Sequence, residues 1–348
     1  MPSFVPAGKP KLCIIADDLT GALDSAAPFA GRGMSTAVAF EPEAVGEALV
    51  TGAEIIAVST RSREIEPEKA AAAVRAVLRQ LPHGTRLFKK IDSRLKGHIA
   101  EELSALNPSV MLVAPAIPEF RRNVRAGAVT GFGVAEPIAV RPRLGALADR
   151  AVIPDTDSLD DLRQALKTAP DALPVGARGL AEAMAEMMTG RAEADAPKPP
   201  AGRALFVVGS RDPITLAQVD TLKRTKDALC YGAPNGILSE TGTSAGLTLV
   251  QALPGETEIS GADVSANLAR SIHPGLTAGC DLLFMTGGAT AEAILRQMGI
   301  RSAILLGECL SGLPLARAGH LTIIAKSGGF GDSNTLAVLA GLSEKKAS

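Results

Sequence analysis

Short apolar runs alternate with longer Ala- and Leu-rich segments through the first half of the chain. Leu12–Ala16 and Ile55–Ser59 have the length and composition of buried strands, whereas Gly21–Ala30 and Glu66–Leu81 have the length and spacing of helices. Strands that alternate with helices in this way form βαβ units. The pattern therefore predicts a parallel sheet covered by helices.

The same alternation returns after a break in the second half. Apolar runs at Leu205–Val208, Leu282–Met285, Ala303–Leu306 and Leu321–Ala325 each lead into a turn that contains glycine. Between the halves, residues 191–203 (RAEADAPKPPAGR) are rich in proline and charge, which is typical of a linker.

These two halves predict the fold class and the domains. We expect two Rossmann-like α/β domains, each of three layers with a parallel or mixed sheet, at residues 1–195 and 196–348. Such domains bind ligands at the carboxyl ends of their strands, so we expect the active site in the cleft between them.

The composition excludes several classes of function. Only 3% of the 348 residues are aromatic and the formal net charge is −1, which argues against a nucleic-acid platform and against attraction to polyanions or membranes. No apolar run reaches the roughly 18–20 residues of a spanning helix, and Met1–Pro10 lacks the features of a signal peptide. The cysteines and histidines lie far apart, which excludes a CxxC zinc module and an HExxH helix. We expect a reduced, cytoplasmic protein that binds small molecules.

Two adjacent carboxylates, Asp17 and Asp18, follow the first predicted strand. They leave the sheet at its ligand-binding edge and turn through Thr20 and Gly21 into a helix. A carboxylate in this place could accept the proton of a reacting hydroxyl. The structural alternative is that one aspartate caps the helix and the other is solvated.

A cationic loop follows a later predicted strand. In residues 87–98, LFKKIDSRLKGH, four cations surround an aspartate and a serine: Lys89, Lys90, Arg94, Lys96, Asp92 and Ser93. Such a group suits a small anion, because charge-assisted hydrogen bonds to a carboxylate or phosphate are strong. The alternative is a solvated charged surface. The segment Thr60–Glu64 also follows a strand and places Arg61 or Arg63 at the same edge.

Three strand-to-helix turns in the second half contain small residues. They lie in Leu205–Gln218, Leu282–Ile300 and Lys326–Leu336. Glycines in such turns allow the backbone to approach a ligand, and the amides at a helix start hold phosphate. The chain lacks GxxxxGK[ST] and the third glycine of a dinucleotide fingerprint, so each turn taken alone could be structural.

Taken in order, these segments resemble the four-carbon acid-sugar kinase family, the ATP-dependent tetronate kinases. The matching motifs span almost the whole chain: ADDLTGA at 16–22, TRSR at 60–63, KKIDSRLKGH at 89–98, PAIPEFRR at 115–122 (family pattern PAFP-x-x-GR), GARGLA at 176–181, GSRDPIT at 209–215, GGATA at 287–291 and KSGGFG at 326–331. In that family the N-terminal domain binds the sugar acid and the C-terminal domain binds ATP.

The resemblance implies a role for each matching residue. It implies that the catalytic base is Asp17 or Asp18, and that the substrate site consists of Arg63, Lys90, Asp92, Ser93, Lys96 and Arg122. It implies an ATP site made of Ser210, Gly287, Gly288, Ala289, Thr290, Gly328 and Gly329. The implied reaction transfers phosphate from ATP, with Mg²⁺ on unassigned ligands, to a terminal or near-terminal hydroxyl of a tetronate or 3-oxo-tetronate. A homodimer is compatible with this resemblance.

The chain also departs from the family pattern. Ala289 replaces the acid of GGDTA, Arg211 and Asp212 replace the Cys-Ser of GSCS, STLRGN becomes SRLKGH, and the segment between Pro137 and Ala151 is shorter than in the family. These departures leave open a nucleotide- or sugar-acid-binding protein of the same fold without turnover. A Rossmann-type oxidoreductase is the other alternative, although its third glycine and ribose-binding acid do not appear in place.

Overall fold

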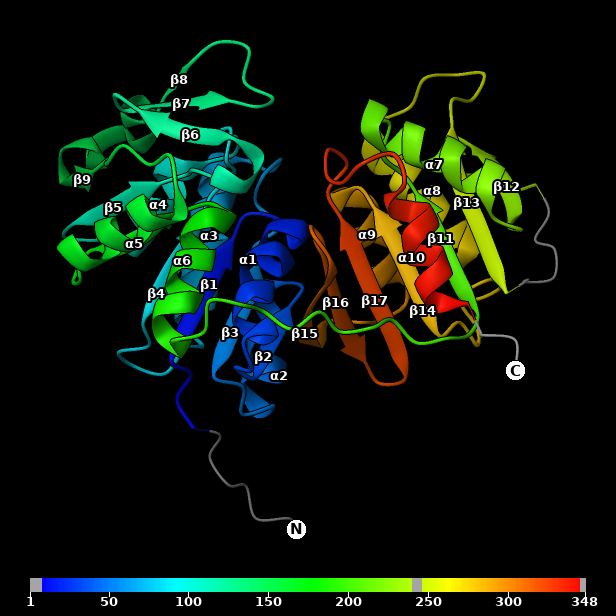
Figure 1. The fold of residues 1–348 in the computed structure, drawn as a ribbon, viewed down its shortest axis with the longest axis horizontal. Helices are drawn as coiled ribbons and strands as arrows, with labels where there is room; N and C mark the ends of the chain where they lie inside the picture. Colours follow the sequence, from blue (N-terminus) through cyan, green and yellow to red (C-terminus); the bar gives the residue numbers. More distant parts are fainter. Residues whose placement is uncertain (1–7, 240–245, 345–348) are drawn as a thin grey trace. The chain divides into compact units, whose positions relative to one another are not determined.

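The computed structural model describes residues 8–239 and 246–344. The chain divides into two compact units, residues 1–195 and 196–348, which Figure 1 colours from blue to green and from green to red. Residues 191–203 contain no helix or strand. Among the described residues, no helix is both long and apolar enough to cross a membrane.

The first unit is built on a parallel sheet. Its strands lie in the order β2 (Thr36–Ala39), β3 (Ile55–Ser59), β1 (Leu12–Ala16), β4 (Leu87–Lys90), β10 (Leu173–Gly176), β5 (Met111–Ala114) and β9 (Ala151–Val152). β1 and β3 have the bounds that the apolar runs predict. A small antiparallel sheet of β6 (Arg122–Arg125), β7 (Ala128–Gly131) and β8 (Ile138–Ala139) is added to this unit.

Helices cover both faces of the first sheet. α1 (Leu19–Gly31), α5 (Leu159–Thr168) and α6 (Arg178–Thr189) pack side by side, and α3 (Pro67–Leu78) packs on α4 (Ile99–Leu106). The remaining helices are α2 (Val45–Val50) and three 3₁₀ segments, η1 (Pro42–Ala44), η2 (Pro118–Phe120) and η3 (Arg141–Arg150). α1 and α5 connect their strands toward the β2 edge of the sheet, whereas α3 and α4 connect theirs toward the β9 edge. Because parallel crossovers are right-handed, α1 and α5 lie on the opposite face from α3 and α4.

The second unit repeats this architecture with a mixed sheet. Its parallel strands are β12 (Leu229–Pro234), β13 (Leu247–Leu253), β11 (Ala204–Val208), β14 (Leu282–Thr286) and β17 (Leu321–Lys326), and β16 (Leu313–Ala318) and β15 (Ser302–Leu310) continue the sheet antiparallel. α7 (Pro213–Thr225) packs on α10 (Thr335–Ser343), and α8 (Gly261–Ile272) packs on α9 (Gly288–Gln297). The α/β class with parallel or mixed sheets is confirmed.

One strand of the second unit differs from the sequence expectation. The run Ala303–Leu306 was expected to lead into a glycine turn like the other strands, but β15 continues to Leu310 and returns antiparallel as β16. The tight turn at Ser311 and Gly312, where Gly312 has φ 74°, closes this hairpin.

Both sheets contain a point at which neighbouring strands send their chains to opposite faces. In the first unit β1 lies between β3 and β4 and leads into α1, whereas its neighbours lead into α3 and α4. In the second unit β11 lies between β13 and β14 and leads into α7, whereas its neighbours lead into α8 and α9. Loops that diverge in this way open a crevice at the carboxyl edge, where α/β sheets bind ligands.

Candidate active site

The ends of three neighbouring strands bring the first group of predicted residues to one edge of the first unit. In the parallel register, Ala16 of β1 lies opposite Ser59 of β3 and Lys90 of β4. The segments that follow these residues therefore leave the sheet at one level. They carry the aspartate pair, the arginine loop that ends in Arg63, and the cationic loop that contains Asp92.

Arg63 ties the two aspartates together. Its Nε and Nη2 donate to the two carboxylate oxygens of Asp17 at 2.7 and 2.8 Å, and its Nη1 donates to Oδ2 of Asp18 at 2.8 Å. An oxygen of Asp92 lies 3.9 Å from Nη2. The structure thus places these four predicted residues in one cluster, in which a single guanidinium faces three carboxylates.

The two aspartates differ electrostatically. Burial raises the pKa of Asp17, but the hydrogen bonds and charge of Arg63, together with Lys89 and Lys90, outweigh burial and hold that pKa below its usual value. Burial also raises the pKa of Asp18, where Arg63 offsets only part of the effect and the charge of Asp17 adds to it, so this pKa lies above its usual value. The Asp18 side chain is also the more exposed, at 15% against 3%. Carboxylate pairs whose pKa values are pushed apart in this way are suited to separate roles.

Asp18 also caps helix α1. Its Oδ1 accepts from the backbone N–H of Gly21 at 2.8 Å, and its Oδ2 accepts from the hydroxyl of Thr20 at 2.9 Å. The sequence left open whether one aspartate caps the helix. Asp18 both caps α1 and belongs to the cluster. Lys90 is buried beside the pair, with its Nζ donating to the carbonyl of Ile91 at 3.0 Å.

A buried ion pair that the sequence does not predict lies next to the cluster. Nζ of Lys89 lies 3.0 Å from Oε2 of Glu102, and neither side chain is more than 1% exposed. Oε1 of Glu102 accepts from the hydroxyl of Ser62 at 2.5 Å, and the Ser62 hydroxyl oxygen lies 2.6 Å from that of Thr60. Helix α4 thereby holds the segment that leads into Arg63. Lys89, expected among the cations near the ligand, instead points into the protein.

The loop after β4 is shaped by two local features. Oδ1 of Asp92 accepts from the backbone N–H groups of Arg94 and Lys96 at 2.9 and 3.4 Å. Gly97 has φ 85°, and a Cβ there would lie 2.9 Å from Oδ2 of Asp17, so the close approach of this loop requires glycine. Lys96 itself is exposed, and within the described residues its ammonium forms no ion pair with the cluster.

Arg122 and Ser93 form a second polar group in this unit. Nη1 of Arg122 donates to the hydroxyl of Ser93 at 2.7 Å, and its Nε and Nη2 donate to the carbonyl of Phe132 at 3.0 and 2.7 Å. The residue is only 9% exposed. Burial, and then the charge of Arg94, lower the pKa of Arg122 against the opposing charge of Asp92. In the described part of the chain no carboxylate lies within ion-pair distance of this guanidinium, which leaves a buried positive charge at the loop.

Three small-residue turns meet at the carboxyl edge of the second unit. Val208, Thr286 and Lys326 occupy the same register on β11, β14 and β17. The turns that follow them therefore leave the sheet side by side.

The predicted nucleotide residues are close together in these turns. A Cβ on Gly328 would lie 2.4 Å from the hydroxyl oxygen of Ser210, and one on Gly287 would lie 3.4 Å from the Ser210 backbone nitrogen. Gly329 faces the same group, since its Cβ would lie 3.5 Å from Oδ2 of Asp212. Asp212, one of the departures from the family pattern, caps α7 by accepting from the backbone N–H of Ile214 at 2.9 Å.

The first turn of α9 carries the other predicted nucleotide residues. Gly288 and Ala289 open the helix and Ala289 is exposed. Thr290 is buried, and its hydroxyl lies 3.3 Å from that of Ser265. Thr290 thus contacts α8, whereas Ala289 is exposed.

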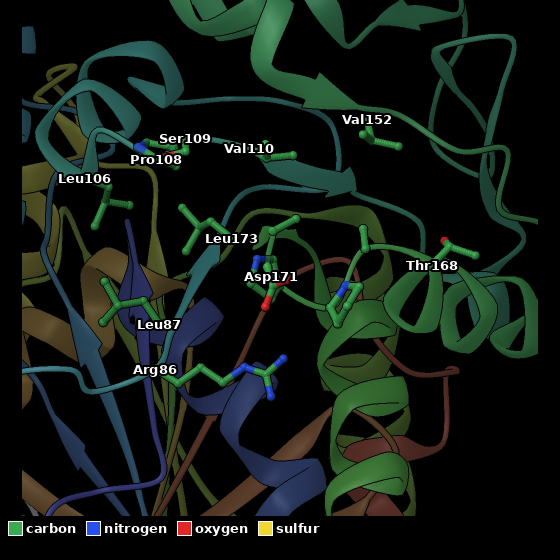
Figure 2. A pocket seen from close by; sticks show the side chains of 14 residues that line it. Arg86, Leu87, Leu106, Pro108, Ser109, Val110, Val152, Thr168, Asp171 and Leu173 are labelled. Carbon is green, nitrogen blue, oxygen red and sulfur yellow. The ribbon is translucent and has the colours of Figure 1, made fainter.

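A cavity of about 890 Å³ lies elsewhere in the first unit (Figure 2). Leu87 and Leu173, the first residues of β4 and β10, line it together with Val110, which precedes β5. It therefore opens at the amino edge of the sheet. The aspartate cluster lies at the other end of the four-residue strand β4, a distance of roughly 13 Å. Its lining is mostly apolar, with Arg86 and Asp171 as the charged residues, so it lacks the group of neighbouring carboxylates found at the opposite edge.

Comparisons with known proteins place the chain in a family. A model described as a sugar-binding N-terminal domain matches residues 12–139, and one described as a nucleotide-binding C-terminal domain matches residues 237–336. The D-threonate kinase of Cupriavidus necator is 31% identical over 404 aligned positions that cover 93% of this chain and 95% of the relative. The chain belongs to the four-carbon acid-sugar kinase family.

Other comparisons also cover nearly the whole chain. The 3-oxo-tetronate kinase of Methylobacterium radiotolerans is 27% identical over 92% of this chain and 96% of its own length. Among solved structures, a Haemophilus influenzae protein superposes with a TM-score of 0.67 at 18% identity, covering 94% of this chain and 99% of that one, which shows the shared fold. The alignment to the Cupriavidus kinase is longer than the 348-residue chain, so that kinase carries segments absent here.

Proposed function

We propose that this protein transfers the γ-phosphoryl group of ATP to a hydroxyl of a four-carbon sugar acid, with a D-threonate or a 3-oxo-tetronate as the first candidates. The observation that carries the proposal is the cluster of Asp17, Asp18 and Arg63 at the switch point of the first sheet, in a chain of this family. Phosphoryl transfer needs little covalent chemistry from a protein. It needs a proton acceptor, cations that offset charge, and donors that hold the phosphates.

Asp18 is the proposed base. It is the more exposed aspartate and the one whose pKa is raised, so it combines access with greater basicity. The acceptor oxygen forms its bond to the γ-phosphorus as the bond to the ADP oxygen breaks, and the hydroxyl proton passes to an Asp18 oxygen. Asp17 has both oxygens bound by Arg63 and orients that guanidinium.

The carboxylate of the acid is proposed to bind at Arg122 and Ser93. The sequence places Arg63 in the substrate site, but the charge of Arg63 is already balanced by the aspartates that accept from its three nitrogens. Arg122 carries a buried charge without a carboxylate partner among the described residues, and Ser93 adds a hydroxyl at 2.7 Å. A substrate carboxylate would neutralise this charge and gain charge-assisted hydrogen bonds.

ATP is proposed to bind the second unit at Ser210 and the glycine turns, as a magnesium complex. In the described residues no cluster of three or more metal-ligating side chains occurs. This fits Mg²⁺, which in such sites is held by one or two carboxylates, water and the phosphates themselves. Asp212 beside Gly329 is the carboxylate that would contribute. The metal would neutralise phosphate charge during transfer. A cytoplasmic location and a homodimer stay predictions.

A kinase assay on a panel of four- and five-carbon sugar acids, with ADP release as the signal, tests the function. On an active substrate, Asp18→Asn should lower kcat by roughly 10²–10⁴-fold. Arg122→Met should raise KM for the acid while KM for ATP stays unchanged, and Arg86→Met, at the opposite edge, is the matched control. Sugar-acid binding without ADP release across the panel would instead identify a binding protein.

A further inference from the structure

A lysine at the nucleotide turn points away from solvent. Lys326 ends β17, and its side chain is fully buried. Its Nζ donates to the carbonyl oxygens of Ser327 at 2.9 Å, Gly328 at 3.0 Å and Phe330 at 2.9 Å. An ammonium has three N–H donors, so this group matches the three carbonyls one to one.

This inward arrangement fixes where the amides of the turn point. In a trans peptide the C=O and the following N–H point in opposite directions. With three carbonyls drawn toward Nζ, the N–H groups of Gly328, Gly329 and Gly331 therefore point away from it. In the part of the chain that the structure describes, these three N–H groups have no acceptor within the protein. Outward amides that follow one another suit a phosphate.

We propose that Lys326 is a positioning residue that holds the amides of turn 327–331 toward the phosphates of ATP. The inference rests on the proposed function and deepens it. In this turn the backbone amides would bind the phosphates, and the buried ammonium of Lys326 would hold the backbone in the conformation that presents them. Lys326 does not touch the nucleotide in this account.

Neighbouring side chains indicate that the fold does not depend on Lys326 alone. The hydroxyl of Thr215 donates to the carbonyl of Gly328 at 2.7 Å, and Nε2 of Gln218 donates to that of Phe330 at 2.9 Å. Two of the three carbonyls therefore keep a donor from α7 when the ammonium is removed. Loss of Lys326 should loosen the turn rather than unfold the unit.

The charge state of Lys326 gives an independent measurement. Burial lowers its pKa to about 8, and Asp212 at the start of α7 opposes that shift. Thr215 and Gln218, which also face the turn from α7, do not titrate. A neutral amine has two N–H donors and a lone pair, and the lone pair would face the third carbonyl. Affinity for ATP should therefore fall as pH rises through about 8.

The stability of the protein should move in the opposite direction over the same range. The pKa of Lys326 is about 8 in the fold and 10.5 for an ordinary lysine. Between these values the unfolded chain binds more protons than the folded chain, so this group makes the folded state more stable as pH rises. A loss of affinity without a loss of melting temperature thus separates the positioning role from general destabilisation.

Calorimetric titration of the full chain with MgADP tests the proposal. Lys326→Met should weaken MgADP binding by roughly tenfold or more, because the charge-assisted hydrogen bonds that order the turn are lost. Lys326→Arg should restore part of the affinity. Lys223→Met is the matched control, since Lys223 is an exposed lysine of the same unit that bonds to Gln251, and it should bind as wild type. Binding of the sugar acid should be unchanged in all three variants.

The pH series completes the test. The wild-type dissociation constant should rise between neutral pH and about 9.5 with a midpoint near 8, and the Lys326→Met constant should stay flat. Normal MgADP affinity in a folded Lys326→Met protein, or a flat wild-type series, would overturn the proposal. The wild-type series decides it alone if Lys326→Met does not fold. A wild-type chain that binds neither ATP nor ADP would refute the proposed function instead.

Discussion

Removal of one buried carboxylate should test how the arginine loop is held. Glu102→Gln keeps the shape of the side chain but leaves the ammonium of Lys89 without its counter-charge, in surroundings where neither side chain is more than 1% exposed. Two carbonyl acceptors remain for that ammonium, Ile15 at 3.2 Å and Lys90 at 2.9 Å. They satisfy hydrogen bonds but do not neutralise the charge.

The expected cost follows from this geometry. Breaking a buried ion pair by removing one partner destabilises a protein by about 3–5 kcal/mol, and the remaining acceptors of Lys89 favour the lower end. For a domain of this size, about 3 kcal/mol corresponds to a fall in Tm of roughly 6–12 °C. Activity measured well below that Tm should also fall, because the hydrogen bond from Ser62 to Glu102 orders the segment that leads into Arg63.

Glu101→Gln is the matched control. Glu101 lies beside Glu102 in the first turn of α4, so both changes remove the same interaction with the helix dipole, about 0.3–1 kcal/mol. Thermal unfolding followed by circular dichroism should separate the two variants. The double replacement Lys89→Met with Glu102→Leu should recover most of the stability, since apolar residues of similar volume replace buried pairs well. Equal melting temperatures for the two single variants would refute the account of the buried pair.

Three further predictions concern single residues of the two units. Gly329→Val should weaken MgADP binding while leaving the melting temperature near wild type, because the nearest atom to a new Cβ is Oδ2 of Asp212 at 3.5 Å; calorimetry with unchanged affinity would contradict a backbone approach to phosphate there. Arg121→Gly should stabilise the chain by about 0.5–1 kcal/mol in urea unfolding, since Arg121 has φ 54° where the family pattern carries glycine, and a destabilised variant would show that the arginine compensates for its strain. Because the pKa of Asp18 lies above its ordinary value, kcat should fall on acidification at a pH above 3.8, and Asp18→Asn should lack this limb in its pH profile.

The sequence predicts which side chains gather at the carboxyl edge of the first sheet, for a physical reason. Strands of a parallel sheet end at the same edge, so residues that directly follow apolar runs, such as Asp17 and Arg63, are brought together without knowledge of side-chain contacts. The pairing within the cluster does not follow from this rule. That Arg63 binds both aspartates depends on the path of the loop through Arg61, whose φ of 51° is unusual for a residue with a side chain.

The sequence does not show on which face of the sheet each lysine of β4 lies. Lys89 and Lys90 are neighbours in β4 and must point to opposite faces, but the sequence does not show which face is covered by a carboxylate. A usable signal was present in α4, where Glu102 shares the apolar helix face with Ile99 and Leu103, and a glutamate on such a face needs a buried partner. The β15 hairpin does not follow from the sequence, because Gly307, which directly follows the apolar run Ala303–Leu306, lies inside the strand at a register shift.

The strands of the first sheet end at one level, and this distinguishes residues fixed by the sheet from residues that can vary independently of it. The aspartates that we propose as the proton-handling group follow β1 directly, so their position is tied to that of the sheet. Arg122 belongs instead to the small sheet of β6, β7 and β8, outside the parallel sheet. Variation in residues 118–139 would therefore reshape the acceptance of different acids while the proton-handling group stays in place. For a laboratory that wishes to redirect such a catalyst to new acids, this segment is the place to build a library.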